Sequence, residues 1–196
     1  MPKATNIGTG KLNPISDCYI SIPITGNSGF GNVPLLEGSG FDVVKITFDN
    51  LPDISDSKSA SYNTEPVIGR STPLPTYSHS DSRTISITCH FIIPDGNFDK
   101  YITYLRALES ATYPRIIASS GAPFVPPVVC SIKCGKLLGD SPLCCVLQNY
   151  SVKFPTDVVW DEVSLLPIKF DVDTSWLVVY SSDELPNQDR IFSSGR

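Results

Sequence analysis

Residues 83–91 read RTISITCHF, and this stretch decides the fold. Apolar side chains alternate strictly with polar ones along it, a pattern typical of a β-strand that turns one face to a core. The apolar series consists of Ile85, Ile87, Cys89 and Phe91. We therefore predict a half-buried strand over residues 83–93, with the rest of the core built around it.

The segment before this strand is polar and has no clear period. Residues 52–82 are rich in turn-forming residues and hydroxyl side chains, with scattered charges. Aromatic and aliphatic side chains are spaced among prolines and a glycine: Tyr62, Pro66, Val67, Ile68, Gly69, Pro73, Leu74, Pro75 and Tyr77. This spacing favours an extended segment that lies on another surface. We interpret residues 49–83 as a subunit-contact arm attached to a β core.

After a predicted turn at residues 94–96, the apolar period changes to that of a helix. Apolar side chains fall at positions i, i+3, i+4, i+7 and i+10, which predicts an amphipathic helix. They are Phe98, Tyr101, Ile102, Leu105 and Leu108. Asn97 is the expected N-cap, and Pro114 ends the helix because proline disfavours the α conformation in the residue before it.

Other segments on both sides alternate or carry short apolar runs. Strands are predicted over residues 18–24, 41–48, 128–134, 145–154, 166–172 and 176–180. The last is a continuous apolar run, which suits a strand buried on both faces. Roughly six or seven strands with one helix predict a mainly β fold, a closed or nearly closed sandwich or barrel.

The chain is expected to form one domain over residues 1–196, an ordinary length for a single domain. Residues 1–17 have no period and are interpreted as an N-terminal arm. Residues 181–196 are polar and are interpreted as an extended C-terminal tail. A glycine-rich loop at 26–40 and a proline-rich linker at 115–127 separate the predicted elements.

Composition and charge narrow the classes of function. The chain holds 17 Pro, 13 Gly and 41% apolar residues, which favours a β-rich fold with a real core. No run of about 18 apolar residues exists, so we expect no membrane-spanning helix. The beginning lacks an apolar export segment, so folding in the cytoplasm is expected. The formal charge of −5 argues against affinity for nucleic-acid phosphates.

Motifs for nucleotide binding and catalysis are incomplete. Residues 8–11 read GTGK, but a phosphate loop also needs a glycine at position 5 and a hydroxyl at position 12, where Thr5 and Leu12 stand. Neighbouring Cys89 and His90 point to opposite faces of a strand and cannot form a nucleophile and base pair. We predict no catalytic residue and no cofactor.

One pair of carboxylates also has the arrangement of a catalytic acid and base. Asp171 and Asp173 share a strand face and resemble an acid and base couple. We interpret them as solvated surface residues.

Two functions can be considered for the six cysteines, metal binding and disulfide pairing. Cys130 and Cys134 have a spacing used by zinc ligands, but four residues along a strand separate them by roughly 13 Å. We therefore predict no metal site. In a hairpin, Cys134 could instead meet Cys144 or Cys145 and form a disulfide. The alternative is free, buried thiols, which a reducing cytoplasm favours and an oxidising medium outside the cell does not.

The arm also carries a resemblance to known proteins. Its pieces are DSKSA at 56–60, GRS-x-P at 69–73 and Y-x-x-S-x-x-R at 77–83, followed by a strand. In this order and spacing they resemble the small tail-tube and baseplate-hub proteins of contractile phage tails, especially tube initiators. The similarity is strongest over residues 49–114 and weaker near 144–180.

The resemblance implies a structural role and not an enzyme. It implies the tail-tube architecture, in which neighbouring subunits continue the sheets around a hexameric ring that templates the tube around the DNA channel. Expected partners are copies of the chain and neighbouring tube and baseplate proteins. DNA would pass through the lumen without specific binding, and the protein would reside in the virion after assembly in the host cytoplasm. Alternatives are a baseplate adaptor that joins spike or wedge to tube, and a cell-wall glycan-binding module.

The same resemblance gives candidates for subunit contact. They are Ser57, Lys58, Ser59, Tyr62, Gly69, Arg70, Ser71, Tyr77 and Arg83. Among them, Arg70 and Arg83 can each donate forked hydrogen bonds to a neighbour's carboxylate or carbonyl groups, which lysine cannot reproduce.

Overall fold

The structure, a computed structural model, describes residues 18–24, 42–48, 50–93, 98–114, 126–139, 141–162 and 165–180, together with residues 185, 186 and 191. The predicted N-terminal arm, the loop at 26–40, the turn at 94–96 and the N-cap at Asn97 lie outside the described residues. Most of the linker at 115–127 and of the C-terminal tail at 181–196 does too.

A mainly β fold with one helix is confirmed. In chain order the described elements are β1 (Cys18–Ile24), β2 (Asp42–Thr47), β3 (Asp53–Ser57), β4 (Ala60–Glu65), β5 (Leu74–Ser80), β6 (Thr84–Ile92), α1 (Phe98–Ser110), β7 (Cys130–Cys134), β8 (Leu143–Lys153) and β9 (Lys169–Val178). The described residues hold two more strands than the upper end of the expected number, because the segment before β6 forms strands of its own.

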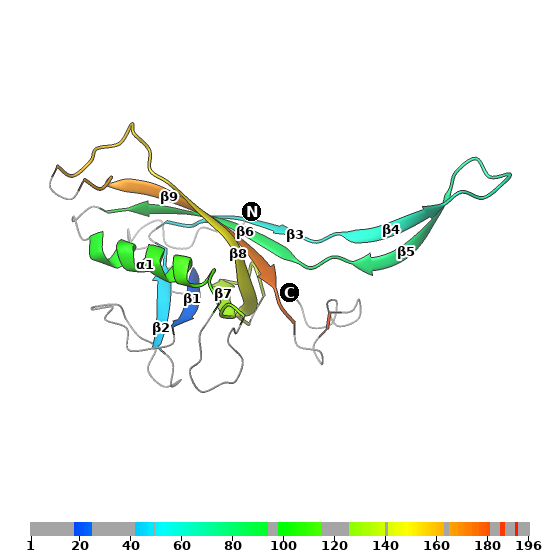
Figure 1. The fold of residues 1–196 in the computed structure, drawn as a ribbon, viewed down its shortest axis with the longest axis horizontal. Coiled ribbons are helices and arrows are strands. Elements are labelled where there is room, and N and C mark those ends of the chain that lie inside the picture. The colour runs from blue at the N-terminus through cyan, green and yellow to red at the C-terminus, as the bar shows by residue number, and fades with distance from the viewer. Residues whose placement is uncertain are drawn as a thin grey trace, which may run out of the picture.

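Seven of the strands form one antiparallel sheet with the order β2-β1-β7-β8-β9-β6-β3. Its two edge strands, β2 and β3, are consecutive in the chain. The chain between Thr47, at the end of β2, and Asp53, at the start of β3, can span at most roughly 22 Å. The two edge strands therefore approach each other, and the sheet is strongly curved. Strands β4 and β5 form a separate hairpin that projects from one end (Figure 1).

The alternation in residues 83–91 produces the predicted strand. The side chains of Ile85, Ile87, Cys89 and Phe91 are all buried in the core, whereas their neighbours are half-buried or exposed. Strand β6 pairs with β9 over its whole length and with β3 on its other side. The strand therefore joins the core to the segment that leads into the hairpin.

The prediction of two strands at 166–172 and 176–180 is wrong, because β9 runs without interruption between them. Thr174 is polar and broke the apolar pattern, yet its side chain is buried. Its hydroxyl donates to the carbonyl oxygen of Ile87 at 3.0 Å and accepts a hydrogen bond from Trp176 Nε1 at 2.8 Å. Val179 is exposed, so the apolar run at residues 176–180 is buried on one face only.

Helix α1 confirms the prediction from the 3.6-residue period. It lies on the concave side of the sheet and contacts β1, β2 and β8. The buried face is centred on Tyr101, Tyr104 and Leu108, whereas Ile102 and Leu105 are only half-buried. The buried face is thus rotated from the expected stripe and includes Tyr104, whose hydroxyl lies 3.2 Å from the hydroxyl of Thr47 on β2.

Candidate functional site

The most unusual feature of the molecule is the hairpin of β4 and β5, which we call the hairpin arm (residues 60–80). The strands pair in antiparallel register from Ala60↔Ser80 to Glu65↔Leu74, with a bulge after Ser61. Every residue of β5 is exposed, as is all of β4 except Ser61. The sequence predicted an extended arm here but no strands, since a hairpin exposed on both faces has no apolar alternation.

The tip of the hairpin arm is a tight turn with an apolar apex. The N–H of Arg70 donates to the carbonyl oxygen of Val67 at 3.2 Å, which closes a four-residue turn. Gly69 occupies its third position with φ of 88°, a left-handed conformation that favours glycine. Ile68, at the second position, is fully exposed. The turn therefore presents an aliphatic side chain to the surroundings.

Halfway along the hairpin arm, two tyrosines pack across the strands. Tyr62 and Tyr77 are register partners whose rings meet edge to face with centroids 5.8 Å apart. Both remain more than half exposed. The Tyr77 hydroxyl lies 2.9 Å from the Ser80 hydroxyl. The pair stiffens the hairpin and leaves aromatic surface uncovered.

An ion pair secures the base of the segment that carries the hairpin arm. Arg83 donates from Nε to Oδ1 of Asp56 at 2.8 Å and from Nη2 to Oδ2 at 2.6 Å. Only 13% of the arginine side chain and 17% of the aspartate side chain are exposed. The hydrogen bond to Asp56 raises the pKa of Arg83, so the guanidinium stays charged. Within the chain, Arg83 thus forms a clamp between β3 and the start of β6.

A second set of contacts holds the two strands together between this clamp and the hairpin arm. The N–H of Asp81 donates to the carbonyl oxygen of Ser59 at 3.0 Å, and the Ser59 hydroxyl donates to Asp81 Oδ2 at 2.6 Å. The Ser57 hydroxyl donates to the carbonyl oxygen of Thr84 at 3.3 Å. Lys58 is exposed beside them.

The candidates for subunit contact therefore fall into three groups along one projecting element. Gly69, Arg70 and Ser71 lie in the loop at its tip, and Tyr62 and Tyr77 lie at its middle. The other four lie at its base: Ser57, Lys58, Ser59 and Arg83. Val67 and Ile68, which the spacing of apolar side chains in the arm included, are not among the nine contact candidates, although their exposure makes them the most apolar part of the tip.

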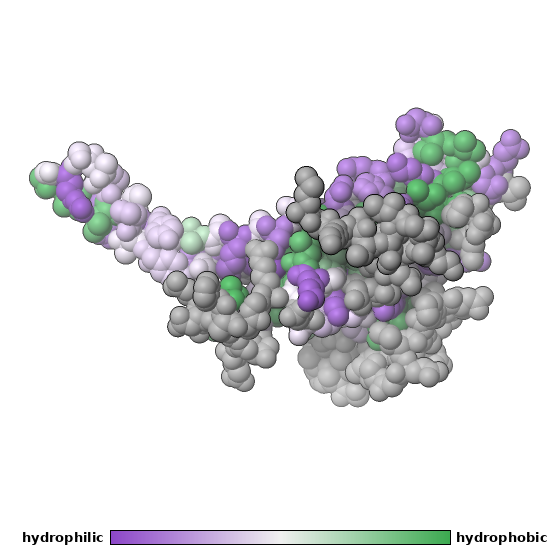
Figure 2. Space-filling model, turned by 180° about the vertical axis from the view of Figure 1, so that it is seen from behind, coloured by the Kyte–Doolittle hydropathy of each residue, from purple (hydrophilic) through white to green (hydrophobic). Residues whose placement is uncertain are grey.

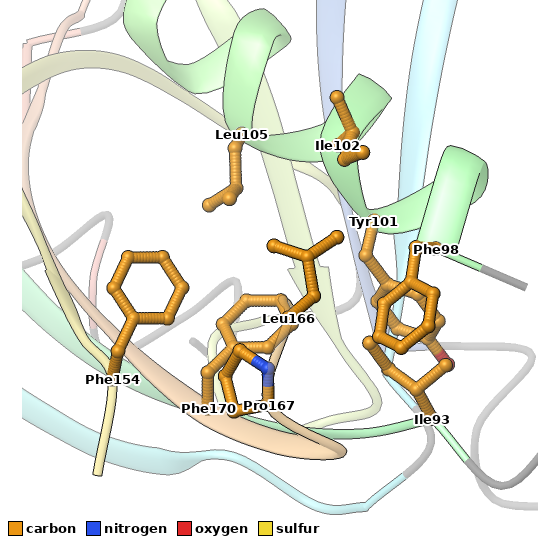
Figure 3. Close-up of a pocket in the computed structure, with 9 residues that line it drawn as sticks. All are labelled: Ile93, Phe98, Tyr101, Ile102, Leu105, Phe154, Leu166, Pro167 and Phe170. Atoms are coloured by element: carbon orange, nitrogen blue, oxygen red, sulfur yellow. The ribbon is translucent and has the colours of Figure 1, made fainter. Parts of the chain in front are cut away.

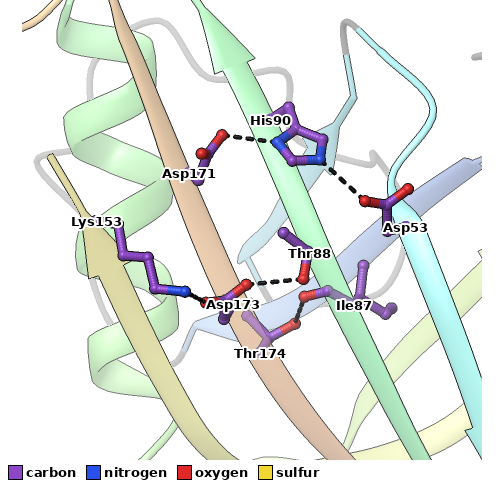
Figure 4. Close-up of polar contacts among 8 residues, drawn as sticks. All are labelled: Asp53, Ile87, Thr88, His90, Lys153, Asp171, Asp173 and Thr174. Carbon is purple, nitrogen blue, oxygen red and sulfur yellow. Dashed lines mark hydrogen bonds and ion pairs between the residues drawn. The ribbon is translucent and has the colours of Figure 1, made fainter. Parts of the chain in front are cut away.

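Further along β6, away from the hairpin arm, polar and charged side chains cross the face of the sheet (Figure 4). His90 on β6 lies between two carboxylates, with Nδ1 2.7 Å from Asp171 and Nε2 3.3 Å from Asp53. Asp173 accepts a hydrogen bond from Thr88 at 2.7 Å and pairs with Lys153 at 2.5 Å. Asp171 and Asp173 thus have separate partners, His90 for Asp171 and Lys153 with Thr88 for Asp173.

This network makes a pH-dependent contribution to stability. Hydrogen bonds to Asp171 and then to Asp53 raise the pKa of His90 above its ordinary value of 6.5. A raised pKa in the folded state means that protonation stabilises the fold; this contribution is complete below pH 6.5 and is lost as the pH rises through the folded pKa. For Asp173 the pH dependence has the opposite sign. Hydrogen bonds from Lys153 and Thr88 lower its pKa, so its contribution to stability is lost only as the pH falls into the acid range.

We expect the difference in melting temperature between the wild type and His90→Gln to be largest below pH 6.5 and to shrink as the pH rises. Glutamine keeps a hydrogen-bond donor but cannot carry the charge. Melting curves across the neutral range test this prediction, with Lys153→Gln as a control that removes a different charge from the same face. A difference that stays constant with pH would rule out a titrating His90.

An apolar cleft lies between α1 and the start of β9 (Figure 3). Aromatic and aliphatic side chains line it: Ile93, Phe98, Tyr101, Ile102, Leu105, Phe154, Leu166, Pro167 and Phe170. The one hydroxyl among them, on Tyr101, donates to the carbonyl oxygen of Ile92 at 3.0 Å. Apart from this hydroxyl, the side chains that line the cleft are apolar.

The cysteines lie differently from the predicted hairpin pairing. Cys134 is not opposite Cys144 or Cys145; it faces Cys18 on β1. Strands β7 and β8 pair in a register that sets Cys130 against Cys145 and Ser131 against Cys144. The predicted pairing of Cys134 with Cys144 or Cys145 is therefore wrong. Cys134 lies beyond the part of β7 that pairs with β8 and pairs with β1 instead. Among the described residues, no three ligand side chains are grouped as a metal ion requires.

No protein-family model and no curated protein matches the chain. Within the part of the chain that the structure covers, no helix has the length and apolar character needed to cross a membrane.

Proposed function

We propose that the protein is a structural subunit that assembles with copies of itself into a ring, of the kind formed by tube initiators in the baseplate hub of contractile phage tails. The observation that carries this proposal is the hairpin arm. Its apolar and aromatic side chains are exposed on both faces: Tyr62, Val67, Ile68, Leu74 and Tyr77.

A hairpin of this kind is a poor independent structure. Two strands without a covering layer are marginally stable in water, and large exposed apolar side chains gathered on one element mark an interaction surface. We call the seven-stranded sheet together with α1 the body of the protein. The core of the body includes no residue between Ile54 and Ile85. The hairpin arm therefore contributes nothing to the packing of its own body, which supports a role in contact with another molecule.

The body offers a complementary surface at its other end. The connection between β8 and β9 lies at the end of the sheet opposite the hairpin arm (Figure 1). It exposes Val159 at 70% and Leu165 at 73%, together with Phe154 and Trp160. Figure 2 shows apolar surface at both the arm tip and the far end of the body, with a paler, polar stretch between them. Two unlike surfaces at opposite ends support a head-to-tail contact, which closes into a ring when the rotation permits.

The resemblance to tube initiators fits this arrangement. The piece at 56–60 spans the end of β3 and the start of the hairpin arm, the piece at 69–73 forms its tip, and the piece at 77–83 leads from β5 to β6. In the described residues, the outer edges of β2 and β3 pair with no strand, which leaves edges for sheet continuation between subunits. We propose a hexameric ring that templates the tail tube in the virion. Its net charge of −5 suits a channel through which DNA passes without binding.

A baseplate adaptor is the second candidate. The hairpin arm and the far end of the body differ in structure, one a thin hairpin and the other a broad surface, which also suits a protein that joins two unlike partners. An adaptor of this kind would bind a spike, wedge or tube protein and would not associate with itself.

Ile68→Asp tests the contact at the arm tip. We expect the variant to fold normally, because Ile68 touches no core, and to weaken self-association about 10-fold to 100-fold, the effect of losing one buried aliphatic side chain of about 1.5–3 kcal/mol. Sedimentation velocity over a range of protein concentrations measures the association, and thermal melting checks the fold.

Leu137→Asp is the matched control, since Leu137 is an exposed leucine in the turn after β7, away from the hairpin arm. It should associate like the wild type. If Ile68→Asp and Leu137→Asp associate as strongly as the wild type, the arm tip is not the contact.

A further inference from the structure

Two cysteines far apart in the sequence meet across adjacent strands. Cys18 on β1 and Cys134 on β7 are direct register partners in an antiparallel pair. Their Sγ atoms lie 2.6 Å apart, and 116 positions separate them in the chain. Opposite residues in antiparallel strands have Cα atoms about 4.5–5.5 Å apart, within the range that a disulfide spans. Backbone and side chains are thus already placed for a covalent bond.

A second pair of cysteines shows that register alone does not bring sulfurs together. Cys130 and Cys145 are also direct partners, on β7 and β8. Each of these thiols is turned to the carbonyl oxygen two residues before it in the chain, that of Val128 at 3.8 Å and that of Leu143 at 3.7 Å. Only the pair of Cys18 and Cys134 directs its sulfurs toward each other, so the described structure distinguishes one pair from the other.

We propose that Cys18 and Cys134 are a modification site, an oxidisable dithiol that a small disulfide of the glutathione type converts to an intramolecular disulfide. Cys134 is half-buried at the end of β7, whereas Cys18 is buried. Reagent therefore meets Cys134 first. The site is separate from the proposed ring contact, and its test does not depend on ring formation.

Thiol–disulfide exchange at this site takes two steps. The thiolate of Cys134 attacks one sulfur of glutathione disulfide, whose S–S bond breaks and releases one glutathione thiolate. The thiol of Cys18 then gives its proton to solvent, attacks Sγ of Cys134 and displaces the second glutathione thiolate. Two protein thiols are oxidised, one small disulfide is reduced, and the two thiolates released take up two protons. Burial raises the pKa of Cys18, so the second step accelerates in alkaline solution.

The bond would fix β1 to the centre of the sheet. It closes a long loop that contains β2, the hairpin arm, β6 and α1. Closing long loops restricts the unfolded chain most, so we expect the melting temperature to rise by about 10 °C on oxidation.

Mass spectrometry of the full chain after treatment with glutathione disulfide tests the proposal. Trypsin places the cysteines in separate peptides, except for adjacent Cys144 and Cys145: residues 12–45, 84–100, 116–133, 134–136 and 137–153. We expect a non-reducing digest to contain peptide 12–45 linked to peptide 134–136, and the link to disappear after reduction.

Two variants make the result decisive. Cys134→Ser changes a half-buried side chain and should lose both the linked peptide and the rise in melting temperature. Cys144→Ser removes an exposed thiol and should keep both. In the wild type, mixed disulfide formation at Cys144 shows that the reagent is active. If Cys144 is modified while peptide 134–136 stays unlinked or joins peptide 137–153, the proposal is wrong.

Discussion

Replacing Arg83 with alanine is expected to destabilise the folded chain by about 3 kcal/mol, near the low end of what removing one partner of a buried ion pair costs. The guanidinium makes both hydrogen bonds of a fork with Asp56, and both side chains are largely shielded from water. Alanine leaves the carboxylate in a partly dry position without its cation. For a chain of this length, the melting temperature should fall by about 10 °C.

Urea unfolding of Arg83→Ala and Arg83→Lys measures this effect. Lysine keeps the charge but loses the fork, so we expect an intermediate loss of stability. Arg106→Ala is the matched control, because Arg106 is exposed on α1 and should change stability by less than about 0.5 kcal/mol. An Arg83→Ala variant as stable as Arg106→Ala would show that the clamp does not hold the fold.

Excising the hairpin arm is expected to abolish self-association while the body stays folded. The N–H of Asp81 donates to the carbonyl oxygen of Ser59, the same bond that closes a two-residue turn. Replacing residues 60–80 by Asn-Gly therefore joins the two strands where they already meet. The core contains no residue of the excised segment, so its packing is untouched.

We expect the excised chain to melt within a few degrees of the wild type and to sediment as a monomer at every concentration. A loss of association of more than about 100-fold corresponds to about 2.7 kcal/mol per contact, within reach of several buried apolar side chains. A variant with Ser-Gly in place of Asn-Gly controls for the choice of turn. Unchanged association after excision would place the subunit contact elsewhere on the body.

The sequence predicted those elements in which one face is buried. Alternation fixed β6, and the 3.6-residue period fixed α1, because burial on one side imposes a period on the side chains. Strand β9 was divided wrongly at Thr174. A threonine on the apolar face looks like an interruption until its partners, the carbonyl of Ile87 and the indole of Trp176, are known.

The hairpin arm was located by its sequence pieces, but its strands were not predicted. Since both of its faces are exposed, no period distinguishes it from an irregular segment. The contact between Tyr62 and Tyr77 depends on the bulge after Ser61, which shifts the register by one residue and has no signature in the sequence.

The sequence could not predict which distant strands pair in the sheet. The order of the sheet places β1 beside β7, and this order alone brings Cys18 to Cys134. A local hairpin between β7 and β8 was the simpler expectation and set Cys134 against the wrong strand. The partner of Arg83 within the chain could not be predicted either, because Asp56 lies on β3, which the sequence did not predict as a strand.

The central claim is that copies of this chain close into a ring through the hairpin arm. Negative-stain imaging of the purified full chain, with its mass measured by light scattering on the same sample, tests this claim most directly. We expect closed rings of uniform diameter whose mass is six times that of the 21.3 kDa chain. A monomer at every concentration, or open chains of variable length, would contradict it.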